Sequence, residues 1–566
     1  MINLAIDPQV SAPPGTAVEV AELTVRAGKR VLLENASARF EPGTVTLIVG
    51  PSGVGKSVLL KILAGLIGRS HGEIEVSGSV TFGGEEVLKA RGPRLAGVVF
   101  QNFALFDELS PTDNVRFAAA HRPRRKDDQN QRSGSLAPAD LLKELSVPRS
   151  VRTATLSGGQ RQRLAIARTL AYDPDVILYD EPTSGLDLAT ARQVANLISQ
   201  TQHSHPKTSI IVTHDYEALT PIADAVYLLD PTTRSLRKIP PEQWGRLGES
   251  LTPPAIEERI DPSAWRGWLR ERMAGLAHWP GDVLAGTTHV LEATAQIPLR
   301  LLPLWKSPFW GLRYALHYLR LVAGVSAWIY IAVAGIIIGY VLTHFTLIYF
   351  PHSKFIKPVL LDDILRALGF MLYRVFVPVL ATILIAARCG AAVASDVGGK
   401  TYGQQMDALR TFRINPASYL LTGILYAFVI GAPLLVGISF LLAKYTSLVA
   451  FVLLHPEQGA DYWNFNFHRE LSEPGQWLYV GTDWLLAKVL FCAVGVALIA
   501  YFRGARPKYS NRDVSTGITT TILWATLYTL VVHFAFAFVE FDGITLWDWL
   551  VPPAEEQLSA WAWLAG

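Results

Sequence analysis

The stretch Leu156-Ser157-Gly158-Gly159-Gln160 decides the fold of the first half of this chain. It follows a glycine-rich loop, Gly50-Pro51-Ser52-Gly53-Val54-Gly55-Lys56-Ser57, and precedes an apolar run that ends in Asp180-Glu181. A glycine-rich loop of this kind alone indicates only a nucleotide-binding site. The three elements in this order restrict the class of protein much more than the loop alone does.

The glycine-rich loop stands in the context that phosphate binding requires. Val45–Val49 is predicted as a buried parallel strand that runs into the loop, and a helix is predicted from Ser57 onward. Glycines 50, 53 and 55 let backbone N–H groups turn toward phosphate oxygens, aided by the positive end of the helix. We expect Lys56 to reach the β- and γ-phosphates of a nucleotide and the Ser57 hydroxyl to bind Mg²⁺.

Two further apolar runs bring acidic and imidazole groups to the same place. Val176–Asp180 is predicted as a buried strand with a carboxylate at its end, where ligands collect in open α/β sheets. Asp180 is therefore placed to hold the Mg²⁺ shell, and Glu181 to orient or deprotonate the attacking water. A third strand, Ser209–Thr213, leads to His214, which we expect to contact the γ-phosphate.

The order of these parts resembles the ABC ATPase family, over roughly residues 16–245. The resemblance implies that Gln101 is the Q-loop glutamine, which senses Mg²⁺ and the membrane domain, and that Ser184–Asp187 is the D-loop. It also implies that the Ser157 hydroxyl and the glycine amides after it bind the γ-phosphate held by a second subunit. The chain is therefore predicted to be an ATPase that works as a homodimer, with ATP and Mg²⁺ as cofactors.

The predicted site residues fall into three groups. The catalytic candidates are Glu181, His214 and Gln101. Mg²⁺ contacts, through ATP, are expected from Ser57, Asp180 and Gln101. The nucleotide is expected to contact Gly50, Ser52, Gly53, Gly55, Lys56, Ser57, Ser157, Gly158, Gly159, Gln160 and Asp187.

Two positions in the first half depart from the family pattern. The stretch Thr24–Gly28 lacks the aromatic residue that usually stacks on adenine, and Arg26 is the available substitute. Val58 stands where a small hydroxyl residue is common, which removes one phosphate contact. Neither change touches the hydrolytic set, so we expect catalysis to be intact.

The composition divides the chain into a polar first part and an apolar second part. Half of the 566 residues are hydrophobic, the formal net charge is +3, and the long apolar runs gather in 321–540. Such a small charge does not indicate nucleic-acid binding, and no cleavable signal peptide is expected. We predict an ABC ATPase domain at 1–245, a proline-rich linker with a membrane-proximal helix at 246–300, a permease domain at 301–545 and a tryptophan-rich tail at 546–566.

Five segments approach the ~20 apolar residues that a membrane-spanning helix needs. They are 323–350, 367–387, 418–444, 483–502 and 517–539. Trp305–Arg320 carries three cations and is expected to lie at the cytosolic membrane face. Basic residues follow the second and fourth segments, whereas 455–482 and the tail are acidic. This pattern predicts a multi-pass protein of the cytoplasmic (inner) membrane, with the ATPase domain in the cytosol and the C-terminus outside.

A second resemblance is carried by residues 372–416. Leu372–Pro378, Ala386–Gly398 and Gln404–Leu409 resemble motifs of MlaE-type permeases, the membrane subunits of ABC transporters that move phospholipids or related lipids with MCE-domain partners. The resemblance covers about residues 285–540 and implies substrate or coupling roles for Arg374, Arg388, Asp396, Gln404 and Asp407. An arginine inside an apolar segment is a functional candidate by default, and a buried ion pair or a snorkelling arginine is the structural alternative.

Several carboxylates that the permease pattern leads us to expect are replaced in this chain. Val375 stands where an acid is expected beside Arg374, and Gln404 and Arg410 replace glutamates. Asp396 replaces a longer acid. Gating, coupling or the substrate itself is therefore expected to differ from the family pattern.

The two resemblances together predict an α/β P-loop ABC ATPase domain fused to an all-α polytopic membrane domain of about five transmembrane helices and an interfacial helix. The leading hypothesis is a homodimeric, MlaF-like and MlaE-like lipid transporter that works with an extracytoplasmic MCE-type protein and a small cytosolic accessory subunit. An ABC exporter of another hydrophobic compound is the first alternative. A non-transporting mechanotransducer acting on a partner outside the membrane is the second.

Overall fold

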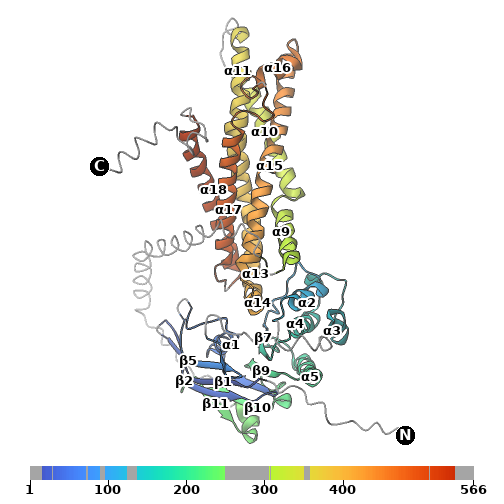
Figure 1. Cartoon of the computed structure of the whole chain (residues 1–566), viewed down its shortest axis with the longest axis vertical. Coiled ribbons are helices and arrows are strands. Elements are labelled where there is room, and N and C mark those ends of the chain that lie inside the picture. Colours follow the sequence, from blue (N-terminus) through green and yellow to red (C-terminus); the bar gives the residue numbers. More distant parts are fainter. Residues whose placement is uncertain are drawn as a thin grey trace, which may run out of the picture. The chain divides into compact units, whose positions relative to one another are not determined.

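The computed structural model describes residues 16–28, 30–71, 74–88, 96–123, 137–248, 305, 307–349, 357–473, 475–508 and 510–541. The chain divides into two compact units, and Figure 1 draws one as sheets with short helices and the other as long helices. The first unit is Met1–Ile297 with Gly403–Asn415, and the second is Pro298–Tyr402 with Pro416–Gly566. The predicted linker at 246–300 lies almost wholly outside the described residues, and the predicted tail at 546–566 lies entirely outside them.

A largely parallel sheet forms the centre of the first unit. Its strand order is β11-β10-β3-β9-β8-β7. All pairs are parallel except β10 with β11. The central strands β3, β8 and β9 are buried along their whole length, as expected for strands that are covered on both faces. The strands are β3 (Val45–Val49), β7 (Ala96–Val99), β8 (Val176–Asp180), β9 (Thr208–Thr213), β10 (Ala225–Leu229) and β11 (Leu236–Ile239).

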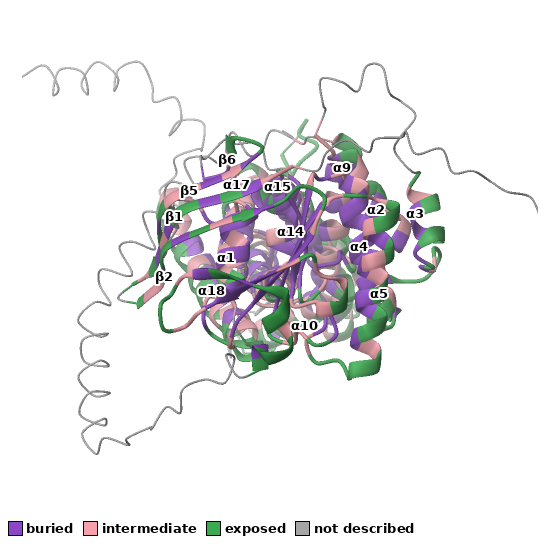
Figure 2. Cartoon of the chain, turned by 90° about the horizontal axis from the view of Figure 1, so that it is seen from below, coloured by how far each residue is buried: buried purple, intermediate pink, exposed green. Residues whose placement is uncertain are grey.

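A second, antiparallel sheet has the order β2-β1-β5-β4, with β6 paired to β5. Along β1 most buried side chains are separated by exposed ones, as is typical of a sheet with one solvated face (Figure 2). The strands are β1 (Val18–Ala27), β2 (Arg30–Phe40), β4 (Ser70–His71), β5 (Ile74–Phe82) and β6 (Glu85–Glu86).

Helices complete the first unit. Ser110 and Ser157 cap α2 and α4 through their side-chain oxygens, and Asp187 caps α5 in the same way. A large apolar core joins α4, α5 and the parallel sheet. The helices are α1 (Lys56–Leu63), α2 (Pro111–Ala120), α3 (Pro138–Glu144), α4 (Gly158–Tyr172), α5 (Leu188–Ser204) and α14 (Gln405–Thr411).

The second unit is helical. Its helices are α9 (Pro308–Val322), α10 (Val325–Tyr349), α11 (Lys357–Met371), α12 (Val377–Ile385), α13 (Ala391–Tyr402), α15 (Pro416–Leu454), α16 (Gly459–His468), α17 (Thr482–Ala505) and α18 (Asn511–Phe541). Two π-helical turns, Leu372–Phe376 and Ala386–Gly390, join α11, α12 and α13 into one long rod. Such turns are frequent at functional sites.

Five helical stretches among the described residues are long and apolar enough to cross a membrane. They are Pro308–Tyr349, Leu360–Tyr402, Pro416–Leu454, Thr482–Ala505 and Asn511–Glu540. Each contains most or all of one predicted segment, so the predicted fold class is confirmed. The stretch expected to lie at the membrane face forms α9, which Ala323 and Gly324 separate from α10.

Glycines let α10 and α15 approach closely. A Cβ atom on Gly335 would lie 2.4 Å from the Ser439 carbonyl oxygen, and one on Gly339 would lie 2.2 Å from that of Ala443. Small residues at such crossings are typical of helices packed in a membrane, where dispersion contacts replace the hydrophobic effect. The buried hydroxyls of Thr343 and Ser447 add a 2.7 Å hydrogen bond between the same helices.

Candidate functional site

The glycine-rich loop connects β3 to α1 as the sequence predicts. Gly53 and Gly55 have φ values of 80° and 111°, a left-handed region that favours glycine. Lys56 is only 4% exposed, and its Nζ donates to the carbonyl oxygens of Gly50 at 2.8 Å and Pro51 at 3.1 Å. Burial lowers the pKa of the Lys56 ammonium, and the nearby carboxylates of Glu181 and Asp180 oppose that shift. A bound phosphate would give this ammonium a stronger partner than two carbonyls.

Asp180 and Glu181 stand at the carboxyl end of β8, next to the loop. The Ser57 hydroxyl donates to Asp180 Oδ1 at 3.3 Å, and Asp180 is 3% exposed. Burial raises the pKa of Asp180, while the hydrogen bond from Ser57 and the charges of Lys61 and Lys56 lower it. A hydroxyl beside a buried carboxylate is a donor set that suits Mg²⁺, whose preferred ligands are oxygens.

Glu181 joins two of the other predicted residues. One of its oxygens lies 3.7 Å from Lys56 Nζ, and the other lies 3.1 Å from His214 Nδ1. His214 directly follows β9, so the ends of the neighbouring strands β3, β9 and β8 bring these three side chains together. Lys56, Glu181 and His214 therefore lie together at one edge of the parallel sheet.

Gln101 and Asp187 are held by local hydrogen bonds. Gln101 is exposed, and its Nε2 donates to the Ser184 hydroxyl at 3.3 Å, which joins the Q-loop to the predicted D-loop. Asp187 caps α5 by accepting hydrogen bonds from Thr190, and these bonds lower the pKa of Asp187. The contact of Gln101 with Mg²⁺ stays a prediction.

Ser157, Gly158 and Gly159 form an exposed start to α4. The Ser157 hydroxyl accepts from the Gln160 backbone at 3.4 Å, and the Gln160 side chain accepts from the Ser157 backbone at 3.0 Å. This capping box satisfies the end of the helix while the glycine amides remain exposed to a ligand. The pentapeptide thus presents a helix N-terminus on the surface of the unit.

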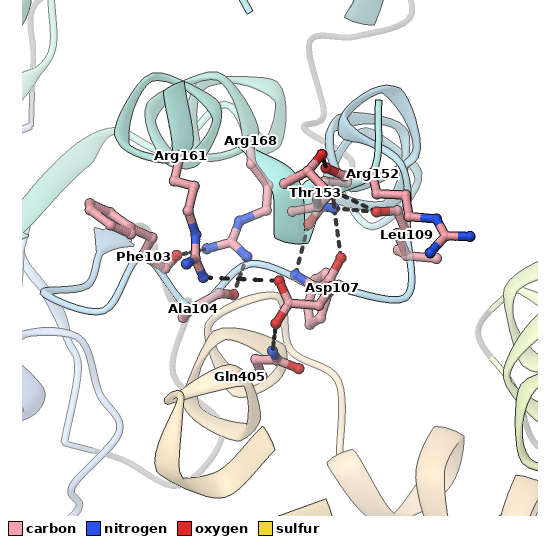
Figure 3. A network of polar contacts seen from close by, with 12 residues as sticks. Phe103, Ala104, Asp107, Leu109, Arg152, Thr153, Arg161, Arg168 and Gln405 are labelled. Carbon is pink, nitrogen blue, oxygen red and sulfur yellow. Dashed lines mark hydrogen bonds and ion pairs between the residues drawn. The ribbon is translucent and has the colours of Figure 1, made fainter. Parts of the chain in front are cut away.

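Two arginines of α4 reach the segment that follows Gln101. Arg168 donates to the carbonyl oxygens of Phe103, at 3.1 Å, and Ala104. Arg161 Nη2 lies 3.9 Å from Asp107 Oδ1, and Figure 3 shows Asp107 between Arg161 and Gln405. Charged side chains of α4 are therefore in contact with residues 103–107, which are called the Q-loop segment below.

The helix α14 belongs to the ATPase unit, although it comes from the middle of the permease sequence. Gln405 Nε2 donates to Asp107 Oδ2 at 3.5 Å. The Phe412 ring lies against Tyr172 and Phe117, with centroids 5.1 and 6.3 Å away, and under Arg168 at 5.6 Å. A polar and an aromatic contact thus hold α14 beside the Q-loop segment.

The other coupling candidates are also on or beside α14. Asp407 Oδ2 lies 3.5 Å from Lys61 Nζ, and its Oδ1 accepts from Arg410 at 3.0 Å. Gln404 has a left-handed φ of 59°, and its buried Oε1 has no hydrogen-bond partner among the described residues. A glutamate at 404 would place an uncompensated charge there, which is costly, so the neutral amide suits this environment.

Arg374 is part of a buried charge cluster. Its Nε donates to Glu540 Oε1 at 2.8 Å, and Lys488 Nζ donates to Glu540 Oε2 at 2.8 Å. The side chains of Glu540 and Lys488 are 1% and 4% exposed. The structure therefore realises the buried ion pair that was the alternative for Arg374, and α18 supplies the carboxylate that is missing at Val375. Lys488 and Glu540 were not predicted as site residues, although an ionisable residue within or beside an apolar segment is the usual signal.

Arg388 and Asp396 connect α13 and the turn before it to α9 and α10. Arg388 donates to the Leu321 carbonyl oxygen at 3.0 Å and to the Ser326 hydroxyl. Asp396 accepts from Lys400 at 2.7 Å and from the Tyr318 hydroxyl at 3.0 Å. The structure does not bring these two residues together with Arg374 in one described network, so the five permease candidates form separate groups.

Comparison with known proteins gives two family matches on one chain. The ABC transporter family model matches residues 33–184, and the Permease MlaE model matches residues 319–539. The intermembrane phospholipid transport system ATP-binding protein MlaF of Haemophilus influenzae is 32% identical over 228 residues, which is 38% of this chain and 80% of that protein. The sulfate/thiosulfate import ATP-binding protein CysA of Escherichia coli is 33% identical over 273 residues, or 47% and 71% of the two chains.

A solved structure is also similar to part of this chain. The bacterial ABC transporter cassette MJ0796 is 26% identical, and the match covers 40% of this chain and 98% of that chain with a TM-score of 0.33. The predicted ATPase activity and ATP binding are supported by the ABC transporter match. The five long apolar helices among the described residues of this chain, together with the MlaE match, identify a multi-pass membrane protein. The chain belongs to the ABC transporter family, with an MlaF-like ATPase and an MlaE-type permease fused in one polypeptide.

Proposed function

We propose that this chain is half of a homodimeric transporter. It would use ATP to move phospholipid, or a related lipid, across the cytoplasmic membrane, out of it or into it. An extracytoplasmic MCE-type protein would carry the lipid on the far side. The observation that supports this most is α14, which lies within the MlaE match and is packed in the ATPase unit. One chain therefore links the hydrolytic site to the permease.

The nucleotide site supports a dimer. Lys56, Asp180 and Glu181 gather at the ends of the parallel strands, whereas Ser157 and its glycines are exposed at the start of α4. An exposed helix end with free amides can bind the γ-phosphate of a nucleotide held by a second copy. Each dimer would then contain two ATP sites, each made from both chains.

The proposed hydrolysis uses the residues at the strand ends. Ser57 and Asp180, with Gln101, would hold Mg²⁺, which neutralises phosphate charge when bound. Glu181 would orient or deprotonate the attacking water, and His214, 3.1 Å from that carboxylate, would contact the γ-phosphate and keep Glu181 in place. Lys56 would leave its loop carbonyls for the β- and γ-phosphates.

The lipid path is proposed near the buried charge cluster. Lys488 and Arg374 place two cationic groups around Glu540 within the helical unit. Cationic groups within an apolar helical unit can pair with an anionic group such as a phosphodiester headgroup. Basic loops after the second and fourth helical stretches support a cytosolic ATPase and an outside C-terminus.

Lipid transport can be tested with purified full-length protein in liposomes that contain a fluorescent phospholipid. We expect MgATP to change the fraction of label that an external quencher reaches, and Glu181→Gln to abolish that change. Mass spectrometry of lipid that co-purifies in detergent identifies the cargo. Reproducible absence of lipid, with no lipid effect on the ATPase rate, would count against lipid and favour another hydrophobic substrate.

A further inference from the structure

Lys61 lies on the same face of α1 as the Mg²⁺ candidate Ser57, one helical turn further on. Its Nζ is 3.5 Å from Asp407 Oδ2 on α14. The two side chains are 32% and 19% exposed, so the pair is partly shielded from water. The helix that starts at the phosphate-binding loop is thus in direct ionic contact with the permease-derived helix.

Lys61 also acts on the other side, toward Asp180. Its positive charge is among the groups that favour the ionised form of the Asp180 carboxylate, against the effect of burial. Lys61 is thus ion-paired with Asp407 and acts on Asp180 at longer range, from one turn beyond Ser57, whose hydroxyl donates to Asp180 at 3.3 Å. Coulomb attraction is pairwise, so neutralising one carboxylate leaves the other as the main attraction on the ammonium, which can then move closer to it.

We propose that Lys61 is a positioning residue that transmits occupancy of the metal–nucleotide site to α14 through Asp407. A divalent cation beside Asp180 neutralises that carboxylate and repels the Lys61 ammonium. The attraction of Lys61 then goes mainly to Asp407, and α14 is held more tightly against α1. This route is additional to the Q-loop contact, since it does not pass through Gln101.

The other contacts of α14 do not depend on the metal site, so a stronger attraction between Lys61 and Asp407 would act on one side of this helix alone. Gln405 and Phe412 bind the part of the unit formed by α2, α4 and Asp107, and none of these contacts involves the metal site. Figure 3 shows Gln405 facing Asp107 from α14. The contacts of Gln405 and Phe412 would stay constant, whereas the ion pair of Asp407 with Lys61 would strengthen when metal and nucleotide bind. This difference would shift α14, together with α13 and α15, to which it is joined.

The experiment measures hydrogen–deuterium exchange of peptides covering 403–415 in the full chain, in a Glu181→Gln background that holds ATP without hydrolysis. Three states are compared: no nucleotide, ATP with EDTA, and ATP with Mg²⁺. Exchange of peptides covering 50–57 reports nucleotide occupancy in each state. We expect Mg²⁺ to slow exchange of 403–415 at least fivefold at equal occupancy, the low end of the roughly 5–150-fold effects typical of coupled sites.

Five further variants separate this role from a merely structural one. Lys61→Met and Asp407→Asn should each remove the Mg²⁺-dependent part of the protection, and the double variant should remove no more than either alone. Lys61→Arg should restore most of it. Arg410→Gln is the matched control, because Arg410 also binds Asp407 but lies on α14 itself.

The inference fails if Mg²⁺ does not change exchange of 403–415 in the parent protein, or if the change persists in Lys61→Met. It also fails if Arg410→Gln removes the change as completely as Lys61→Met. The measurement needs no lipid, although its meaning rests on the proposed transport function. A parent protein with normal Mg²⁺-dependent exchange but no lipid movement in liposomes would refute the cargo and leave the role of Lys61 standing.

Discussion

Arg374 Nε donates a 2.8 Å hydrogen bond to Oε1 of Glu540, which joins positions 166 residues apart in the chain. The second oxygen of the same carboxylate accepts from Lys488. The last helix of the permease is thereby fastened to the π-helical turn before α12 and to α17. A close approach at Gly481 accompanies this pair, since a Cβ atom there would lie 2.6 Å from Arg374 Nε.

Glu540→Gln should lower the stability of the helical unit. The change removes the counter-charge that Glu540 supplies to the buried Lys488 and to Arg374, and breaking a buried ion pair in this way typically costs about 3–5 kcal/mol. Thermal unfolding of the purified chain in detergent measures the effect, with the exposed Glu457→Gln as a control that should change little. Adding Lys488→Met to Glu540→Gln should recover part of the loss, because it removes the cation that loses its Glu540 partner; no recovery would mean that the lost charge pairing is not the cause.

Mixed dimers should show which copy supplies Ser157 to a given site. If the sites are shared, a dimer of one Lys56→Ala copy and one Ser157→Ala copy keeps one intact site, with about half the normal hydrolysis if the two sites act independently. Placing both changes on one copy damages both sites, and removal of one such donor typically costs about 10²–10³ in rate. Single-turnover hydrolysis by differentially tagged dimers distinguishes the two arrangements, and the opposite order of rates would show that each chain completes its own site.

Removing Mg²⁺ should weaken the stabilisation that ATP gives to the ATPase unit. A ligand at 100 times its Kd stabilises the folded state by about 2.7 kcal/mol, and chelation raises the Kd and reduces this gain. Differential scanning fluorimetry with ATP, in the presence of Mg²⁺ or EDTA, measures the difference in Tm. Asp180→Asn should abolish most of that difference, whereas Asp140→Asn in α3 should leave it intact.

Phe412→Ala should separate hydrolysis from transport. The ring fills a site between Phe117, Tyr172 and Arg168, so its removal should loosen α14 by an amount within the ~3–5 kcal/mol typical of buried Phe→Ala changes. We expect lipid movement per ATP hydrolysed to fall at least tenfold while hydrolysis persists. Exposed Arg413→Gln is the control, and an unchanged ratio of transport to hydrolysis in Phe412→Ala would show that this contact does not carry coupling.

The cluster of side chains at the strand ends could be anticipated from the sequence because its parts are local motifs. Lys56, Asp180 and His214 each follow a short apolar run, and a parallel sheet brings such positions to one edge. The buried cluster was only half accessible. Arg374 is visible as a charge in an apolar segment, but its pairing with Glu540 depends on how α18 packs beside α12 and α17, which no local pattern encodes.

The sequence indicated that the segment containing α14 has a coupling role, but not which residues of the ATPase unit contact it. A polar stretch between two apolar segments indicates a loop that leaves the membrane, and the permease resemblance suggested that it meets the ATPase. The partners of α14, Lys61 and Asp107, adjoin the glycine-rich loop and the Q-loop, but no feature of either motif marks these two side chains as contacts of α14. Long-range ionic pairs of this type follow from the fold alone.

The ATPase unit of this chain is discontinuous, because Gly403–Asn415 belongs to it. A ribosome completes the nucleotide-binding part long before it makes the segment that covers Phe117 and Tyr172. During synthesis these two rings stay uncovered until the chain has been made as far as residue 415, so the ATPase unit cannot be completed before that part of the permease sequence exists. A fragment ending at 297 should accordingly aggregate more readily than the same fragment supplied with a 403–415 peptide.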